Sequence, residues 1–144
     1  EQAIYALVEC GVSEIQLVET EKTQRAWGRE REYERLRNIM IAAAEQAKYY
    51  TIPPLHTPKP LTELVTGYAN AYKIYADMHG DSFSVLYPIV ASHYVIFSGP
   101  EADTTEQEKK LLHQHEFKFI RLTSTILRAQ QVAPLLTAFI RSLA

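Results

Sequence analysis

Two short segments carry the residue types from which a ligand site can be built. Residues 95–101 read VIFSGPE, an apolar run that stops at a Gly-Pro turn followed by an acid. Residues 117–122 read FKFIRL, and TSTILR follows at 123–128. Each segment is typical of a strand that ends at a sharp turn. Because open α/β sheets present ligands at the carboxyl ends of their strands, the two turns predict a binding pocket.

Other common site chemistries find little support in the sequence. Cys10 is the single cysteine, so neither a disulfide framework nor a thiolate metal cluster is expected. His113 and His115 stand two residues apart, a spacing that splays them on a helix, and we expect no metal site. Ser98 lacks the context of a nucleophile elbow. No Gly-rich phosphate fingerprint occurs either.

Size and charge restrict the classes of protein. The chain has 144 residues and a formal net charge of −2, and we assign residues 1–144 to one domain. A near-neutral net charge argues against binding of nucleic acid by bulk electrostatics, but it is compatible with a local basic patch. No apolar stretch approaches the ~20 residues that cross a bilayer. We therefore expect a cytoplasmic protein with no membrane partner, and the start at Glu1 without a methionine suggests a piece of a longer protein.

Helices and strands alternate along the chain. Apolar spacing predicts helices at residues 2–10, 30–49, 62–65, 105–115 and 130–143, and strands at 14–19, 83–87, 94–98 and 117–122. Thr62 is the expected cap of the short helix, and Thr104 or Thr105 that of the next one. Residues 20–30 are expected to form a loop, and four prolines between 53 and 60 argue against regular structure there. The pattern predicts an α/β fold, a mostly parallel sheet covered by helices on both faces.

Five blocks resemble a known family by their order and spacing. They are LVECGVSEI at 7–15, EKT at 21–23, AAAEQ at 42–46 with IP at 52–53, SGPE at 98–101 and ILR at 126–128. The blocks are similar to ATELGVSEI, ERS, AAEQ…VP, IGPEGG and LGPRILRTETA in the RsmE-type family of SPOUT-class RNA methyltransferases. That family methylates N3 of a uridine in small-subunit (16S) ribosomal RNA.

The resemblance implies a fold, a cofactor and partners. The family forms a deep trefoil knot, in which the C-terminal segment passes through a loop, an exception to the usual rule against knots. S-adenosylmethionine lies bent in that knot, and the subunits form homodimers that act on ribosomal RNA or the small ribosomal subunit. An N-terminal PUA-like RNA-binding domain and the first strand of the catalytic fold have no counterpart here. The expected cofactor-binding residues are Leu86, Tyr87, Phe97, Ser98, Gly99, Pro100, Leu122, Thr123, Ile126 and Leu127.

The resemblance also implies two candidates for catalysis. Methylation at uridine N3 requires loss of the imide proton, and the protein must stabilise negative charge on the uracil oxygens. Arg128 suits that role because a guanidinium is always charged and presents a planar fork. In the alternative interpretation, Arg128 has a structural role and its side chain donates hydrogen bonds to loop carbonyls. Glu101 is a base or loop-orienting residue, or an acid that only completes a helix start.

The chain departs from the family in both turns. Ala102 and Asp103 stand where the family has two glycines, and residues 123–125 read TST in place of Gly-Pro-Arg. Ala and Asp restrict the backbone, and Asp adds a charge near the expected cofactor carboxylate. Two functions therefore stay open: methyl transfer, or a non-catalytic or cofactor-weak SPOUT-fold domain that serves dimerisation or RNA binding. A flavodoxin-like binding module is a third possibility.

Overall fold

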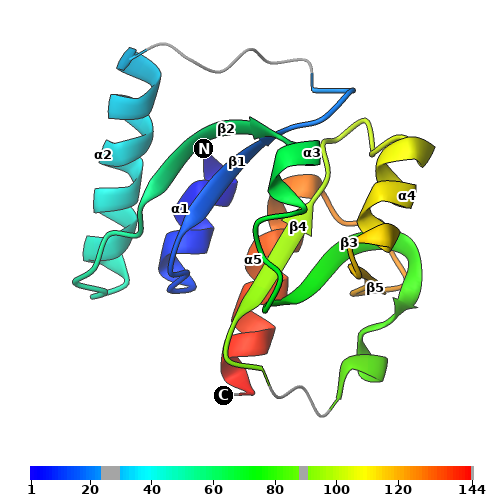
Figure 1. The fold of residues 1–144 in the computed structure, drawn as a ribbon. Helices are drawn as coiled ribbons and strands as arrows, with labels where there is room; N and C mark the ends of the chain where they lie inside the picture. Colours follow the sequence, from blue (N-terminus) through cyan, green and yellow to red (C-terminus); the bar gives the residue numbers. More distant parts are fainter. Residues whose placement is uncertain (24–29, 88–90, 144) are drawn as a thin grey trace.

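The computed structural model describes residues 1–23, 30–87 and 91–143 as an α/β fold (Figure 1). The elements in chain order are α1 (Gln2–Glu9), β1 (Ile15–Glu19), α2 (Glu30–Gln46), β2 (Leu55–Pro60), α3 (Leu61–Leu64), β3 (Tyr72–Ser82), the 3-10 helix η1 (Phe83–Leu86), β4 (Tyr94–Ser98), α4 (Glu106–Gln114), β5 (Lys118–Arg121) and α5 (Ala129–Ser142). Of the loop expected at residues 20–30, positions 24–29 lie outside the described residues. No helix in the described ranges combines the length and apolar character that a membrane crossing requires.

The described strands pair in parallel, as the sequence predicts. They form a two-stranded sheet, β1-β2, and a three-stranded sheet with the order β4-β3-β5. Tyr75 on the central strand pairs with Phe97 on one side and Phe119 on the other. Its ring stacks on Phe97 at 5.4 Å between centroids and meets Phe119 edge-on at 4.8 Å. This aromatic row packs against Leu112 of α4, which is fully buried.

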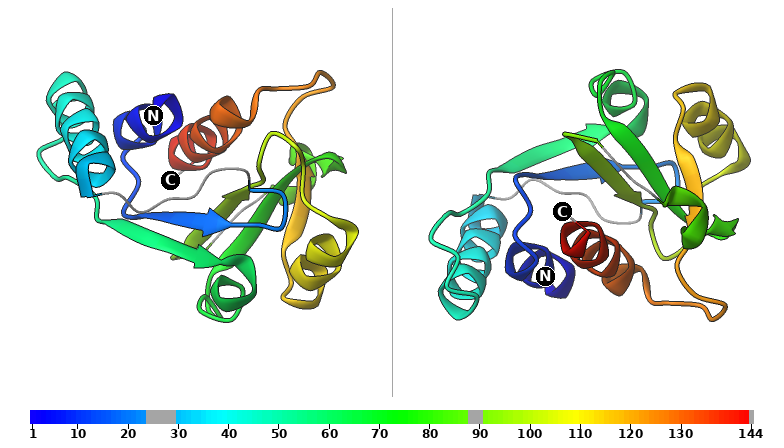
Figure 2. Two further views of the ribbon diagram at one scale, coloured as in Figure 1. Left: turned by 90° about the horizontal axis from the view of Figure 1, so that it is seen from above. Right: turned by 90° about the horizontal axis from the view of Figure 1, so that it is seen from below.

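The next residue of β3 contacts a different helix. Successive side chains of a strand point to opposite faces. Ile74 accordingly packs with Leu136 and Ile140 of α5, whereas Tyr75 packs toward α3 and α4. Figure 2 shows α1 lying between α2 and α5 on one side of the strands. Val8 and Met40 are almost completely buried where α1 meets α2.

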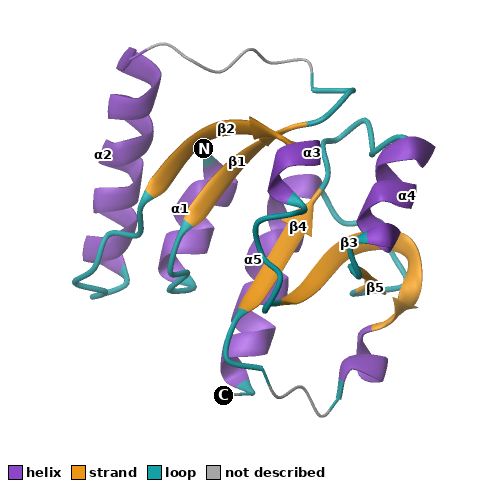
Figure 3. Cartoon of the chain, viewed as in Figure 1, coloured by secondary structure: helices purple, strands orange, loops and turns teal. Residues whose placement is uncertain are grey.

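The proline-rich segment forms a strand, so the expectation of irregular structure there is wrong. β2 includes Pro58 and, among the strands of the described residues, pairs with β1 alone. The two strands lie side by side in Figure 3. The register of the β1–β2 pair shifts between Gln16 and Val18, opposite Pro58. The proline has no N–H to donate, so its missing hydrogen bond falls where the pairing is already irregular. An edge position tolerates this, since the other side of the strand needs no donor.

Two further predictions are wrong. The sequence predicts a strand at residues 83–87, but residues 83–86 form the 3-10 helix η1. The third strand along the chain is instead β3, at Tyr72–Ser82. Ser82 begins η1 by accepting a hydrogen bond from the Ser84 N–H at 3.4 Å. The short helix α3 begins after Pro60, which occupies the cap position expected for Thr62. Thr105, by contrast, caps α4 with a complete capping box, as predicted.

Candidate functional site

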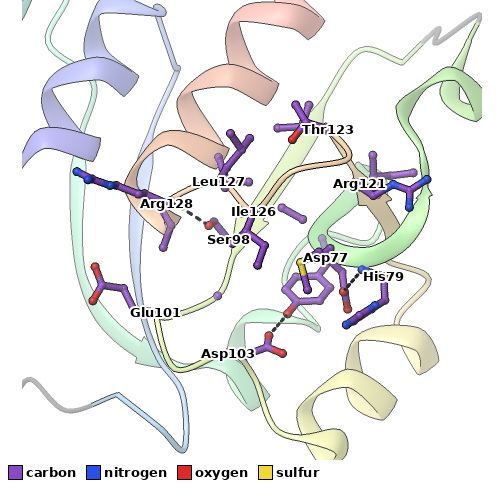
Figure 4. A pocket seen from close by; sticks show the side chains of 18 of the residues that line it. Asp77, His79, Ser98, Glu101, Asp103, Arg121, Thr123, Ile126, Leu127 and Arg128 are labelled. Carbon is purple, nitrogen blue, oxygen red and sulfur yellow. Dashed lines mark hydrogen bonds between the residues drawn. The ribbon is translucent and has the colours of Figure 1, made fainter.

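A pocket of about 450 Å³ opens where β4 and β5 end on either side of the middle of β3. Its walls are residues 75–79 of β3, the ends of β4 and β5, and the segments that follow β4 and β5. This volume lies within the range of sites for small organic ligands, roughly 300–1,000 Å³. Figure 4 shows the lining side chains.

The middle of β3 forms the first wall, through a bulge. Ala76 and Asp81 both pair with Ile120, so residues 77–80 leave the ladder, and Asp77, Met78 and His79 line the pocket. The bulge requires Gly80, because a Cβ there would lie 2.5 Å from the carbonyl carbon of Phe119. Bulges occur next to binding sites because they redirect side chains out of the sheet. Here the redirected residues are 77–79.

The turn after β4 forms the second wall. Gly99 lies close to its neighbours, since a Cβ there would be 3.2 Å from Cγ2 of Thr104 and 3.5 Å from the Tyr75 hydroxyl. Tyr75 and Thr104 are joined by a hydrogen bond of 2.7 Å between their oxygens. Asp103 closes the turn in the left-handed region, with φ at 62°.

The loop after β5 forms the third wall and contacts the second. The Thr123 hydroxyl donates to the carbonyl of Thr125 at 2.7 Å, which turns the loop back on itself. The Ser98 hydroxyl donates to the carbonyl of Ala129 at 3.4 Å, at the start of α5. The two late segments singled out in the sequence therefore meet in space. Ile126, 80% exposed, provides an apolar surface at the mouth.

A cluster of charges lies beside the first two walls. Nζ of Lys109 is 3.3 Å from Oδ2 of Asp77 and 3.0 Å from Oδ2 of Asp103. Burial of Lys109 opposes its charge, but the hydrogen bond to Asp103 and both aspartates outweigh this and raise its pKa to about 12. For Asp103, burial opposes ionisation, yet hydrogen bonds from Lys109 and from the Thr104 N–H lower its pKa below 3.8. Burial raises the pKa of Tyr75 to about 12, so its hydroxyl keeps its proton.

Most of the site residues expected from the sequence line this one pocket. These are Ser98, Gly99, Pro100, Glu101, Leu122, Thr123, Ile126, Leu127 and Arg128. Figure 4 places Glu101 and Arg128 at one side of the pocket and Asp77 and His79 at the other. Arg128 precedes α5 in an extended conformation, and its side chain makes no capping hydrogen bond.

Three expected residues lie elsewhere. Leu86 is buried in the core with α5, and Tyr87 is 70% exposed. Phe97 is buried in the aromatic row beneath the turn. The first wall is consequently built from residues 76–79, because β3 and not η1 reaches the pocket.

The residues that the sequence reasoning missed come mainly from β3. Asp77, Met78 and His79 line the pocket, as does Arg121 at the end of β5. The available signal was the apolar and aromatic content of residues 72–76, which ends at a polar stretch and a glycine. Within the described ranges, no group of His, Cys, Asp and Glu residues is arranged to hold a metal ion.

The pocket combines features that suit a flat, polar-edged ligand. Apolar side chains such as Ile126 and Leu127 offer packing surface, and turns after β4 and β5 offer backbone groups. Arg121 and Arg128 bring positive charge, and Asp77 and Glu101 bring negative charge. Such a mixture fixes both the position and the orientation of a bound molecule.

A family model for an RNA methyltransferase domain matches residues 1–141. No curated protein sequence matches the chain. Among solved structures, ribosomal RNA small subunit methyltransferase E from Neisseria gonorrhoeae, bound to S-adenosyl methionine, is 25% identical with a TM-score of 0.86. The similarity covers 99% of this chain and 60% of that one.

Two more solved structures share the fold. A protein from Legionella pneumophila assigned as a methyltransferase, in complex with the bound cofactor SAM, is 23% identical with a TM-score of 0.89. A probable rRNA-methyltransferase from Porphyromonas gingivalis is 23% identical with a TM-score of 0.85. Each similarity covers 98% of this chain and 60% of the other, so the chain spans about three fifths of the length of these proteins.

Proposed function

The chain belongs to the family of RNA methyltransferase domains, and from this premise we propose that it binds S-adenosylmethionine and methylates ribosomal RNA. The finer proposal is methyl transfer to N3 of a uridine in 16S RNA, in the cytoplasm. The observation that carries the proposal is the meeting of the turn after β4 and the loop after β5 around one pocket. Solved relatives of the same fold hold the cofactor.

The pocket residues fit this cofactor. The pocket volume of about 450 Å³ is that of a small-molecule site, and the lining includes apolar side chains such as Ile126 and Leu127. Ser98, Gly99 and Pro100 would face one side of the nucleoside, and Ile126 and Leu127 the other. When bound, S-adenosylmethionine supplies an electrophilic methyl group on its sulfonium.

The charged residues at one side of the pocket would handle the substrate base. N3 of uridine becomes a nucleophile when its imide proton leaves, and negative charge then spreads to the uracil oxygens. Arg128, whose side chain makes no capping hydrogen bond, would donate to those oxygens and stabilise this charge. Glu101, exposed at the same side, would orient the base or accept the proton.

A homodimer is part of the proposal. Leu135 and Phe139 of α5 and Leu143 at its C-cap follow one another at intervals of four residues and are 48%, 46% and 40% exposed. Residues four apart share one face of a helix. An apolar face of this kind suits contact with a second copy of the chain. The resemblance to SPOUT proteins adds a deep trefoil knot in the C-terminal segment.

We also propose that one further strand completes the sheet between β1 and β4. Within the described residues, β1 pairs with β2 and β4 pairs with β3. Two cavities of about 140 and 680 Å³ are each lined by both β1 and β4, through residues such as Val18 and Phe97. A strand placed before α1 would join β1 through a helix, the usual parallel connection. A longer chain that carries such a strand should protect the amides of β1 and β4 from hydrogen exchange.

The second candidate is a non-catalytic or cofactor-weak domain for dimerisation or RNA binding. It is favoured by Ala102 and Asp103 in the β4 turn and by residues 123–125 in the β5 loop, which depart from the family. Calorimetry with S-adenosylmethionine and with its demethylated product separates the candidates. Binding of both supports the enzyme, and absence of heat at millimolar ligand would leave the non-catalytic domain.

Arg128→Ala tests the catalytic assignment. If Arg128 stabilises the developing charge, the variant should lose methyl transfer about a hundredfold, with cofactor affinity almost unchanged. Arg37→Ala, on an exposed part of α2, is the control. Transfer of labelled methyl groups to ribosomal RNA measures the first quantity and calorimetry the second. Equal losses in both would make Arg128 a scaffold residue only.

A further inference from the structure

One lysine joins two walls of the pocket without lining it. Lys109 projects from α4 and contacts Asp77 in the β3 bulge (3.3 Å) and Asp103 in the turn after β4 (3.0 Å). We call these three residues the lock. The side chains of Asp77 and Lys109 are only 7% and 15% exposed, so water screens their contact weakly.

The lock explains how this chain replaces a glycine of its family. Asp103 stands at the second of two positions where the resembled family has glycine, and its φ is 62°. Side chains rarely adopt that region, although Asp does so more readily than most. Its carboxylate receives three donors that hold it there: the Tyr75 hydroxyl at 3.1 Å, the Thr104 N–H at 2.8 Å and Nζ of Lys109.

The lock also balances charge beside the pocket. Asp103 would repel an anionic group of a ligand in the same turn, as a carboxylate near a carboxylate does. Lys109 lies within 4 Å of both aspartates and offsets part of that charge. Asp77 is held further by the His79 N–H, which donates to its Oδ1 at 2.8 Å. The bulge within β3 and the turn after β4 are therefore tied to one cation.

We propose that Lys109 is a positioning residue, which fixes the β3 bulge against the β4 turn and so shapes the pocket for S-adenosylmethionine. The inference rests on the proposed function for the identity of the ligand. The mechanical role of Lys109 is independent of the proposed function, because it can be measured in the protein without a ligand. Lys109 does not line the pocket, so it has no part in the chemical step.

Hydrogen exchange of the free protein tests the mechanical role. Lys109→Met removes the charge at similar length, and Lys110→Met on the exposed neighbouring position is the matched control. The Lys109 variant should exchange about tenfold faster at the amides of residues 77–81 and 99–104, with α5 unchanged. Lys109→Arg should restore protection, because a guanidinium can bridge two carboxylates. Unchanged protection in Lys109→Met would overturn the proposal.

A second variant keeps the test valid if Lys109→Met does not fold. Asp103→Gly suits the left-handed φ and leaves the contact between Lys109 and Asp77 in place. It should speed exchange at 99–104 only. Equal exchange at 77–81 and 99–104 in this variant would contradict the account, because the bulge would then depend on the turn and not on the lysine.

Cofactor measurements test the consequence for the pocket. In Lys109→Met the KM for S-adenosylmethionine should rise about tenfold while kcat at saturating cofactor stays near the wild-type value. A fall in kcat with unchanged KM would refute the positioning role. If the wild-type protein binds no cofactor, the proposed function fails. A faster exchange in Lys109→Met would then still establish the lock.

Discussion

Replacing Gly80 with alanine tests the close approach of β3 and β5 that shapes the first wall of the pocket. The new methyl group would lie 2.5 Å from the carbonyl carbon of Phe119 and 2.6 Å from the Ile120 nitrogen. Carbon atoms normally contact at ~3.5–4.0 Å, so one strand must move by roughly 1 Å. Overpacking of this kind costs about 1–3 kcal/mol. We expect the upper part of that range, because the obstructing atoms are backbone and cannot rotate away.

Urea unfolding at 25 °C measures this cost, with Gly67→Ala as the control. Among the described residues, a Cβ at Gly67 would come closest to the carbonyl oxygen of Leu64, at 3.5 Å, which is an ordinary contact. The control should change the free energy of unfolding by less than about 1 kcal/mol, in either direction. The Gly80 variant should also bind cofactor more weakly, because its bulge carries pocket residues. If both variants were equally stable, the tight β3–β5 packing would be refuted.

Further predictions concern the core, a helix cap and pH. Leu136→Ala should lower the free energy of unfolding by about 2–5 kcal/mol, since Leu136 is fully buried, whereas Leu135→Ala, at a half-exposed position, should cost far less in the same urea titration. Thr105→Ala should cost about 1 kcal/mol through loss of the α4 cap, seen as a lower urea midpoint. The lowered pKa of Asp103 means that its contribution to stability is present above pH 3.8 and is lost as the pH falls through the lowered value. The pKa of Lys109 is raised to about 12, so its contribution is complete below pH 10.5 and is lost as the pH rises through 12. Unfolding titrations across pH should show both losses in the wild type. In Lys109→Met the alkaline loss should vanish, whereas the acid loss should only shrink, because the Thr104 N–H and the Tyr75 hydroxyl still donate to Asp103.

The sequence predicted those elements whose signals are local. The Gly11 stop after α1, the Thr105 cap of α4 and the apolar runs of β4 and β5 all correspond to the observed elements. Each signal depends on neighbours in the chain, such as a cap that satisfies the first amides of its own helix. The two late turns were predicted for the same reason, and the structure brings them together through Ser98 and Ala129.

The sequence did not reveal β3 because tertiary contacts decide it. Lys73 is buried in this strand, where its ammonium donates to the carbonyl of His115 at 2.9 Å and lies 5.9 Å from the ring centre of Phe117. In a hydrophobic pattern a lysine is counted as a surface residue, so Lys73 hides the buried character of this strand. The bulge at 77–80 then interrupts the period of two that identifies strands. Because β3 is not predicted, the expected cofactor-binding residues include Leu86 and Tyr87 and lack Asp77, Met78 and His79.

The lock was likewise invisible from sequence. Asp103 was expected to restrict the turn and to add repulsive charge. It adopts the left-handed conformation, and Lys109 offsets its charge from the next helix. Only the spatial neighbourhood shows that a departure from the family pattern is compensated by a second residue.

A crystal structure of the protein with S-adenosylmethionine tests the central claim most directly. The account predicts density for the cofactor between the turn at Ser98–Gly99 and the loop at Ile126–Leu127, with its methyl group facing the side of Arg128. Density in the cavities between β1 and β4, or an empty pocket at saturating cofactor, would contradict it.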